Sequence, residues 1–269
     1  MKTVLITGAT DGIGRAAALE LLRAGHRVLV HGRNPEKLDA VRREFATQAD
    51  DGSIETFCAD MSDLKQVAVL AQEVSEKHST LDVLINNAGV LKHSSPVTSG
   101  GLDVRFVVNT LAPALLADLL QDRLGTRGRV ISLSSAAQAP VSLEALAGAQ
   151  ALSDSNAYAQ SKLALTMWST AKAAQNPAGP VFVAVNPGSL LGTNMVKEGY
   201  GMQGKDISIG SGILLRAALD DEFAHASGQY FDNDRGKFAD PHPDALDPAK
   251  SSVVVAKIND LLYEVMSRA

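Results

Sequence analysis

Short apolar segments alternate along the chain with longer ones in which apolar residues recur every three or four positions. Several short segments are apolar at nearly every position, which is typical of strands covered on both faces of a sheet. They predict strands at residues 3–7, 27–31, 53–59, 82–86, 128–134, 180–185 and 228–231. The longer segments predict helices at about 13–24, 35–46, 62–77, 102–123, 157–175 and 208–221.

A last helix is expected to begin at Pro248, with Asp247 as its N-cap, and to run to about Met266. Strand–helix alternation of this kind favours an α/β fold with a doubly wound parallel sheet and helices on both faces. Such sheets bind ligands at the carboxyl ends of their strands. We therefore look for chemistry at that edge.

Composition narrows the class of protein. The chain has 269 residues, 45% hydrophobic and 20% charged, which suits a single domain over 1–269 with a large core. No apolar run reaches the ~18 residues of a membrane span, and the first residues form a strand-like run rather than a cleavable leader. A formal charge of −5 without a long basic run argues against nucleic acid. With Cys58 as the only cysteine, we expect a cytoplasmic protein.

A glycine-rich turn follows the first predicted strand and opens the first predicted helix. Its sequence at 7–14 is Thr-Gly-Ala-Thr-Asp-Gly-Ile-Gly. Glycine lets the backbone approach a bound pyrophosphate, whose charge a helix N-terminus favours. A tight turn without a ligand is the alternative, but the position between strand and helix favours a dinucleotide site. The candidate contacts are Gly8, Thr10, Asp11, Gly12, Ile13 and Gly14.

The end of the second predicted strand selects the coenzyme. NAD-binding sheets usually place an Asp or Glu there for the ribose 2′-hydroxyl, whereas an Arg accommodates a 2′-phosphate. Gly32 stands where the acid is expected, and Arg33 follows it. Because guanidinium binds phosphate in a bidentate manner, we predict NADP(H), with NAD(H) as the second choice. A solvated loop arginine is the alternative, and His31 could contact the 2′-phosphate or be exposed.

Two further strand ends carry candidate coenzyme contacts. They follow the third and fourth predicted strands, whose carboxyl ends meet the same edge of the sheet. Both are expected to support the nucleotide, the first on its adenine side. The residues are Asp60, Met61, Asn87, Ala88 and Gly89.

Tyr158 and Lys162 form Y-x-x-x-K within a predicted helix, so both project from one face. A lysine ammonium close to a phenol favours the phenolate and lowers the tyrosine pKa from ~10. The phenol can then give and take protons near neutral pH, as carbonyl–alcohol redox chemistry requires. Ser135, which ends the fifth predicted strand, is placed to donate a hydrogen bond to a substrate oxygen. The alternatives are an ordinary amphipathic surface and a turn-forming serine.

Together these features resemble the short-chain dehydrogenase/reductase family. The matching motifs appear in the family's order and cover roughly residues 3–195. They are T-G-x-x-x-G-I-G at 7–14, N-N-A-G at 86–89, Asn109, Ser135, Tyr158 with Lys162, and Pro187-Gly188. The resemblance implies a Rossmann-type sheet of about seven strands and an NAD(P)-dependent oxidoreductase. It also implies a homodimer or homotetramer, formed through the helices near 102–123 and 157–175.

The resemblance further implies a catalytic tetrad of Asn109, Ser135, Tyr158 and Lys162. In that scheme Tyr158 is the acid/base and Ser135 orients the carbonyl or alcohol. Lys162 lowers the tyrosine pKa and holds the nicotinamide ribose, while Asn109 supports a relay water. Pro113, four residues after Asn109, has no amide hydrogen for the carbonyl of residue 109. We therefore expect a bent helix and a carbonyl that holds the water; a proline kept for packing alone is the alternative.

Three departures from the family pattern bear on the site. Ser134 precedes Ser135, and the family pattern favours the second. The spacing from Ser135 to Tyr158 is longer than in many members and resembles retinol-dehydrogenase-like ones; we interpret 136–156 as a substrate-side loop or helix, with a lipophilic substrate as one option. Gly192 occupies the position of a family threonine, so Thr193 is the candidate coenzyme contact. The glycine-rich segment 189–212 is expected to be a mobile lid, with a disordered connection as the alternative.

These interpretations predict an NADP(H)-dependent oxidoreductase that interconverts a carbonyl and an alcohol on a small molecule. The histidines show no convincing metal-ligand spacing, so no metal is expected. A dinucleotide-sensing or scaffold protein without catalysis is one alternative. A C=C reductase is the other.

Overall fold

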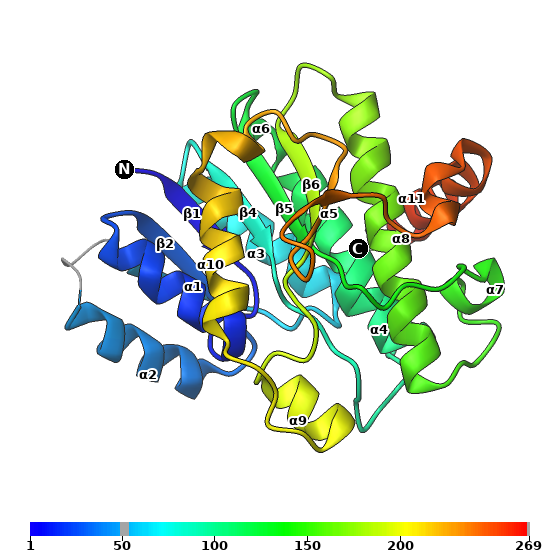
Figure 1. Ribbon diagram of the computed structural model, residues 1–269, viewed down its shortest axis with the longest axis horizontal. Coiled ribbons are helices and arrows are strands. Elements are labelled where there is room, and N and C mark those ends of the chain that lie inside the picture. The colour runs from blue at the N-terminus through cyan, green and yellow to red at the C-terminus, as the bar shows by residue number, and fades with distance from the viewer. Residues whose placement is uncertain (49–53, 268–269) are drawn as a thin grey trace.

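The computed structural model describes residues 1–48 and 54–267 (Figure 1). Within these residues one sheet has eight strands, in the order β3-β2-β1-β4-β5-β6-β7-β8. Neighbours from β3 to β7 in this order pair in parallel, and β8 pairs antiparallel with β7. The predicted doubly wound parallel sheet is confirmed.

The strands lie close to the predicted segments, with one addition at an edge. Their bounds are β1 Thr3–Ile6, β2 Arg27–Gly32, β3 Ile54–Cys58, β4 Val83–Asn86, β5 Arg129–Leu133, β6 Val181–Asn186, β7 Tyr230–Asp232 and β8 Lys237–Ala239. Residue 53, the expected start of β3, lies outside the described residues. β8 was not predicted, because three residues in a polar, turn-rich stretch are too few to show a period of two.

Most helices also match their predicted segments. Their bounds are α1 Gly12–Arg23, α2 Pro35–Ala46, α3 Leu64–Lys77, α4 Val104–Phe106, α5 Ala112–Leu119, α6 Gln121–Leu124, α7 Leu143–Leu146, α8 Asp154–Gln175, α9 Asn194–Tyr200, α10 Ser208–Leu219 and α11 Pro248–Ser267. The predicted start of the last helix is confirmed, since the Asp247 carboxylate accepts the N–H groups of Ala249 and Lys250. The short helices α7 and α9 were not predicted as such.

Helices cover both faces of the sheet (Figure 1). On one face, Val4 and Ile6 of β1 belong to a buried cluster with side chains of α1, α2 and α10. On the other, Leu5 belongs to a cluster with side chains of α3, α5, α8 and α11. Alternate residues of β1 thus face opposite layers, as the period of two requires. Burial on both faces explains why the strands are apolar throughout.

The single helix predicted over 102–123 is wrong. The chain forms α4, then a π-helix over Val107–Leu111, then α5 and α6. In the π-helix the Ala112 N–H donates to the carbonyl of Val107, five residues back. Pro113 cannot supply the amide hydrogen that a regular α-helix would direct at residue 109, and this missing donor accompanies the change of winding. The water-binding role of the Asn109 carbonyl stays a prediction.

The two helices expected to form subunit contacts are covered within the chain itself. In α5, residues 112–117 are all buried, and in α8 residues 160–169 are all buried. α11 packs on α8 and belongs to the same buried cluster, through side chains such as Val254, Ile258 and Leu262. Over residues 112–117 and 160–169, these helices are therefore covered by other elements of the same chain.

Candidate active site

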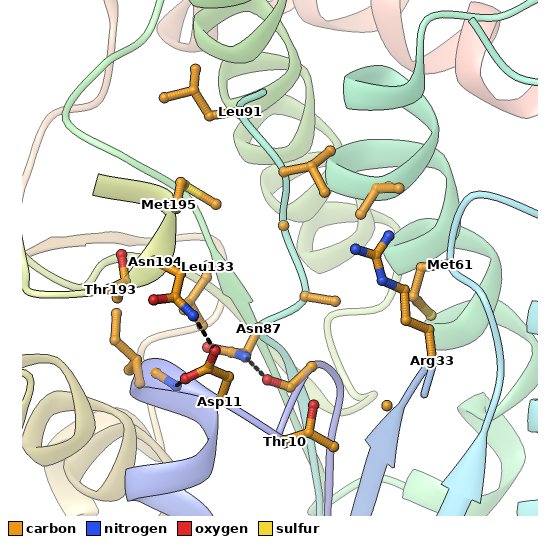
Figure 2. A pocket seen from close by; sticks show the side chains of 18 of the residues that line it. Thr10, Asp11, Arg33, Met61, Asn87, Leu91, Leu133, Thr193, Asn194 and Met195 are labelled. Atoms are coloured by element: carbon orange, nitrogen blue, oxygen red, sulfur yellow. Dashed lines mark hydrogen bonds between the residues drawn. The ribbon is translucent and has the colours of Figure 1, made fainter. Parts of the chain in front are cut away.

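A cavity of about 440 Å³ opens at the carboxyl edge of the sheet (Figure 2). The turn after β1, the end of β2, the segments after β3, β4 and β6, and α8 all contribute to its lining. Figure 2 shows Arg33 and Met61 at one end, and Thr193 and Met195 at the other. The predicted residues that line it are Gly8, Thr10, Asp11, Gly12, Ile13, Arg33, Asp60, Met61, Asn87, Ala88, Gly89, Tyr158, Lys162, Pro187 and Thr193.

Four predicted residues do not line the cavity: Gly14, Asn109, Ser135 and Gly188. A Cβ at Gly14 would lie 2.4 Å from the Asn87 amide nitrogen, so this glycine lets α1 approach the segment after β4. The Asn87 amide in turn donates to the carbonyls of Thr7 (2.8 Å) and Gly8 (3.0 Å). Gly14 and Asn87 therefore shape the glycine-rich turn from behind.

The end of β2 has no room for an acidic side chain. A Cβ at Gly32 would lie 2.5 Å from Cγ2 of Thr10, whereas real Cβ contacts are essentially never below 3.0 Å. Arg33 follows with an exposed side chain that lines the cavity. Lys37, in the first turns of α2, lines it as well. We did not predict Lys37; its place in the first turn of the helix that follows Arg33 was the signal that could have found it.

His31 lines the cavity but is not exposed, and its contact with a 2′-phosphate stays a prediction. Its side chain is buried, with 2% of the residue accessible. Nδ1 accepts the Gly8 N–H (3.1 Å), and Nε2 lies 3.0 Å from the carbonyl oxygen of Ala59. Burial lowers the pKa of His31 to about 4, so the ring is neutral at physiological pH.

Tyr158 and Lys162 line the cavity together from one face of α8. The Lys162 Nζ is 5.6 Å from the centroid of the Tyr158 ring and donates to the carbonyl of Leu133 at 2.6 Å. Burial lowers the pKa of Lys162 to about 8. Burial raises the pKa of Tyr158, a hydrogen bond with Ser135 opposes this, and Tyr200 adds to it.

The expected lowering of the Tyr158 pKa by Lys162 is therefore wrong for this structure. Two facts account for it. Tyr158 is half-buried, and this partial loss of water contact disfavours the phenolate. The Lys162 ammonium donates to the Leu133 carbonyl. At neutral pH the Tyr158 hydroxyl keeps its proton.

The two adjacent serines after β5 have different surroundings. Ser134 is buried, and its Oγ lies 2.7 Å from Oγ1 of Thr166 and 3.3 Å from the carbonyl of Lys162, both on α8. Ser135 is half-buried, and its hydroxyl hydrogen-bonds with Tyr158 and accepts the Ala137 N–H. The geometry thus joins β5 to α8 through Ser134 and leaves Ser135 beside the phenol.

This difference gives a paired prediction. Ser135→Ala should lower kcat by about 10²-fold, the usual cost of one hydrogen-bond donor at a reacting oxygen, with little change in the melting temperature. Ser134→Ala should leave kcat nearly unchanged and lower the free energy of unfolding by about 1–2 kcal/mol, because Thr166 loses a buried partner. Steady-state kinetics measures kcat, and thermal unfolding measures stability. A loss of kcat in Ser134→Ala and a loss of stability in Ser135→Ala would exchange the roles of the two serines.

Asn109 is fully buried, and its side chain holds the segment after β4. Oδ1 accepts the Val90 N–H at 2.8 Å, and Nδ2 donates to the Val90 carbonyl (3.0 Å) and to Oγ of Ser161 (2.9 Å). With these bonds the amide is occupied on both sides. Asn109 thus connects the π-helix, the cavity wall after β4 and α8.

The segment after β6 is structured around α9 and covers the glycine-rich turn. Thr193 caps α9 by accepting the Val196 N–H, and its methyl group would lie 3.5 Å from a Cβ at Gly12. The Asn194 amide donates to the Asp11 carboxylate (Figure 2). Gly192 donates to the Lys205 carbonyl at 2.7 Å, and a Cβ there would lie 3.0 Å from that oxygen. This close approach explains why a threonine is absent at 192.

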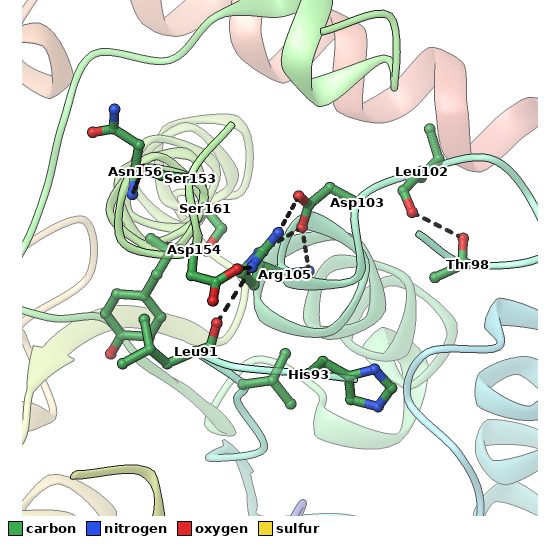
Figure 3. Close-up of polar contacts among 12 residues, drawn as sticks. Leu91, His93, Thr98, Leu102, Asp103, Arg105, Ser153, Asp154, Asn156 and Ser161 are labelled. Atoms are coloured by element: carbon green, nitrogen blue, oxygen red, sulfur yellow. Dashed lines mark hydrogen bonds and ion pairs between the residues drawn. The ribbon is translucent and has the colours of Figure 1, made fainter. Parts of the chain in front are cut away.

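A buried arginine joins the start of α8 to α4, and the sequence analysis did not predict this contact. Arg105 has 1% of its surface exposed and pairs with Asp103, at 2.6 Å, and with Asp154 (Figure 3). Asp154 lies in the first turn of α8, four residues before Tyr158. The ion pairs thus tie the helix that carries Tyr158 to α4. Of the described residues that line the cavity, none comes from 136–156, so a substrate role for that segment stays a prediction.

Metal-binding clusters and membrane-spanning helices are both absent from the described residues. In residues 1–48 and 54–267, no group of three or more His, Cys, Asp or Glu side chains is placed to hold a metal ion. Over the same residues, no helix has the length and hydropathy needed to cross a bilayer.

Comparison with known proteins decides the family. A family model for short chain dehydrogenases matches residues 2–203. The chain belongs to the short-chain dehydrogenase family. This short-chain dehydrogenase is 39% identical over 205 residues to a Streptomyces sp. (strain C5) protein provisionally named daunorubicin C-13 ketoreductase DnrU. The aligned region covers 74% of this chain and 70% of the relative.

A second relative of this short-chain dehydrogenase is retinol dehydrogenase 13 of Homo sapiens, 30% identical over 273 residues that span 91% of this chain and 80% of the relative. Among solved structures, a protein of Escherichia coli CFT073 provisionally assigned as a short chain dehydrogenase and complexed with NADPH has a TM-score of 0.70 at 26% identity, covering 86% of this chain and 96% of that one. The resemblance to retinol-dehydrogenase-like members is confirmed. The chain is an NAD(P)-dependent oxidoreductase of carbonyl and alcohol groups.

Proposed function

We propose that this short-chain dehydrogenase uses NADP(H) and reduces a carbonyl to an alcohol with Tyr158 as the proton donor. The observation that carries the proposal is the cavity itself: the glycine-rich turn, Arg33 and the Tyr158–Lys162 pair all line it. When bound, NADP(H) supplies or accepts the hydride. The residues fit a dinucleotide, because Gly8 and Gly12 adopt positive φ values of 65° and 57°, which keep side chains out of the turn.

The preference for NADP(H) is supported by the end of β2. The Thr10–Gly32 contact excludes the acid that an NAD site would use. Arg33 and Lys37 bring two cations to the same end of the cavity, where a 2′-phosphate would accept hydrogen bonds from both. The E. coli relative complexed with NADPH is consistent with this choice.

The roles of the chain's own residues follow from their positions. Tyr158 donates its hydroxyl proton to the carbonyl oxygen as the alcohol forms, and Ser135, beside it, donates a hydrogen bond to the same oxygen. Lys162 lies under the tyrosine ring and lines the cavity from the same helix face. Because its pKa is raised, Tyr158 is protonated at neutral pH, which is the form that donates a proton when a carbonyl is reduced.

The proposal is tested by NADPH oxidation with a panel of carbonyl compounds. The panel should include small aldehydes, aryl ketones, a polycyclic ketone and retinaldehyde, with NADH run in parallel. We expect turnover with at least one carbonyl, an alcohol as the product, and faster reaction with NADPH. Saturation of a C=C bond in the product, or tight NADPH binding without any turnover, would favour the two alternatives instead.

The homodimer or homotetramer that the family resemblance implies stays a prediction. Residues 112–117 and 160–169 are buried within one chain, so subunit contacts would use other surfaces, such as the exposed Val253 and Tyr263 of α11. Light scattering after size exclusion should give the mass of two or four chains at micromolar concentration, and the mass of a single chain would contradict the prediction. A cytoplasmic location remains proposed, on composition and the single cysteine alone.

A further inference from the structure

His31 lies between three strand ends under the adenosine end of the cavity. It belongs to β2, with β1 on one side and β3 on the other. Its ring bridges these neighbours, because Nδ1 accepts the N–H of Gly8 after β1 and Nε2 meets the carbonyl of Ala59 after β3. A carbonyl can only accept, so Nε2 carries the proton and Nδ1 is the free acceptor. The bonds fix both the tautomer and the orientation of the ring.

The same residue holds two successive amides of the glycine-rich turn. The ring accepts the Gly8 N–H, and the backbone carbonyl of His31 accepts the Ala9 N–H at 2.8 Å. From the opposite side, the Asn87 amide donates to the Gly8 carbonyl, and a Cβ at Gly8 would lie 2.9 Å from Cα of Ala88. Gly8 is thus clamped between β2 and the segment after β4. Nδ1 is thus one of the acceptors that hold the turn in this conformation.

Protonation of the ring would place an N–H at Nδ1, facing the Gly8 N–H that now donates to it. The charged groups around this end of the cavity are Asp11 in the turn, Asp60 after β3, Arg33 after β2, and Lys37 in α2. Burial lowers the pKa of His31 to about 4, while the bond to Ala59 and the charge of Asp60 oppose that shift. The neutral ring is therefore the form present wherever the coenzyme binds near neutral pH.

We propose that His31 is a positioning residue for the coenzyme: its neutral ring fixes the glycine-rich turn in the conformation that binds the dinucleotide phosphates. The inference rests on the proposed function, because it takes the cavity to be the NADP(H) site. It predicts that loss of the ring acceptor weakens coenzyme binding and leaves the carbonyl chemistry on α8 unchanged. His31 also lines the cavity, but in this role it acts through the turn that it holds.

Titration of NADP⁺ into the full-length protein by calorimetry tests the inference. His31→Phe keeps an aromatic ring without an acceptor and should raise the dissociation constant about tenfold or more, since a buried N–H loses its partner. His31→Gln retains an acceptor and a donor, so we expect it to restore part of the affinity. His225→Gln, at an exposed histidine, is the matched control and should bind as the wild type does. At saturating NADPH, kcat should stay near the wild-type value in every variant.

The outcomes separate the inference from the proposed function. A folded His31→Phe protein with wild-type affinity overturns the inference alone, whereas a wild-type protein that does not bind NADP⁺ overturns both. If His31→Phe does not fold, nitrogen NMR of the wild-type imidazoles decides. An Nε2–H tautomer that titrates near pH 4 supports the inference, and a ring that titrates near 6.5 or carries its proton on Nδ1 overturns it.

Discussion

Replacing Tyr158 by phenylalanine should lower kcat by about 10³-fold, within the 10²–10⁴ range of general acid catalysis, and leave the dissociation constant for NADPH nearly unchanged. The ring would keep its packing on α8 while the hydroxyl that faces Ser135 is lost. Substrate reduction then has no donor at the carbonyl oxygen. Single-turnover kinetics with a carbonyl from the panel, together with NADPH titration, measure the two quantities separately.

Tyr263→Phe is the matched control for that experiment, because Tyr263 lies on α11 with 75% of its surface exposed. It should react at the wild-type rate. If Tyr158→Phe also kept its rate, Tyr158 would be removed from the mechanism. An equal loss of NADPH affinity would instead mean that the tyrosine acts mainly on coenzyme binding.

Arg33→Ala should raise the KM for NADPH by about 10- to 100-fold, since a charge-assisted hydrogen bond contributes about 1.5–3 kcal/mol. NADH has no 2′-phosphate, so its KM should change little. Lys37→Ala should act in the same direction with a smaller effect, because ammonium offers phosphate no bidentate contact. Steady-state kinetics with both coenzymes gives the ratio of the KM for NADPH to the KM for NADH in each variant.

Arg42→Ala removes the same charge from an exposed position of α2 and serves as the control for general electrostatics. It should leave both KM values unchanged. A parallel loss of affinity for NADPH and NADH in Arg33→Ala would show that the guanidinium does not recognise the 2′-phosphate. In that case the absence of an acid at Gly32 would not by itself select the coenzyme.

The fold and much of the cavity could be predicted because their signals are local. A strand, a glycine-rich turn and a helix follow one another within residues 3–23, and Tyr158 and Lys162 are four apart on one helix. Periodicity and spacing are enough to place such groups on a common edge or face. The sequence predicted only part of the change after Phe106, because Pro113 indicates a missing hydrogen-bond donor but not a π-helix.

Other features depend on contacts between distant segments. Arg105 is buried only because Asp103 and Asp154 flank it, and Asp154 is 49 positions away in the chain. Gly192 replaces a threonine because Lys205 approaches its backbone. The pKa of Tyr158 moved opposite to expectation because burial of the phenol outweighs a lysine that binds another group. None of these partners is marked by spacing along the chain.

The amino-acid sequence alone therefore determined the doubly wound sheet, the family and the edge at which the cavity opens, since hydrophobic period and short motifs act over a few residues. Only the tertiary structure decided that His31 hydrogen-bonds to the glycine-rich turn, that Ser134 and Ser135 have different surroundings, and that α11 covers α8. The physical reason is that burial and hydrogen-bond partners are set by strands and helices from distant parts of the chain. These long-range contacts fix the protonation state of a side chain and the faces left for solvent or a second copy.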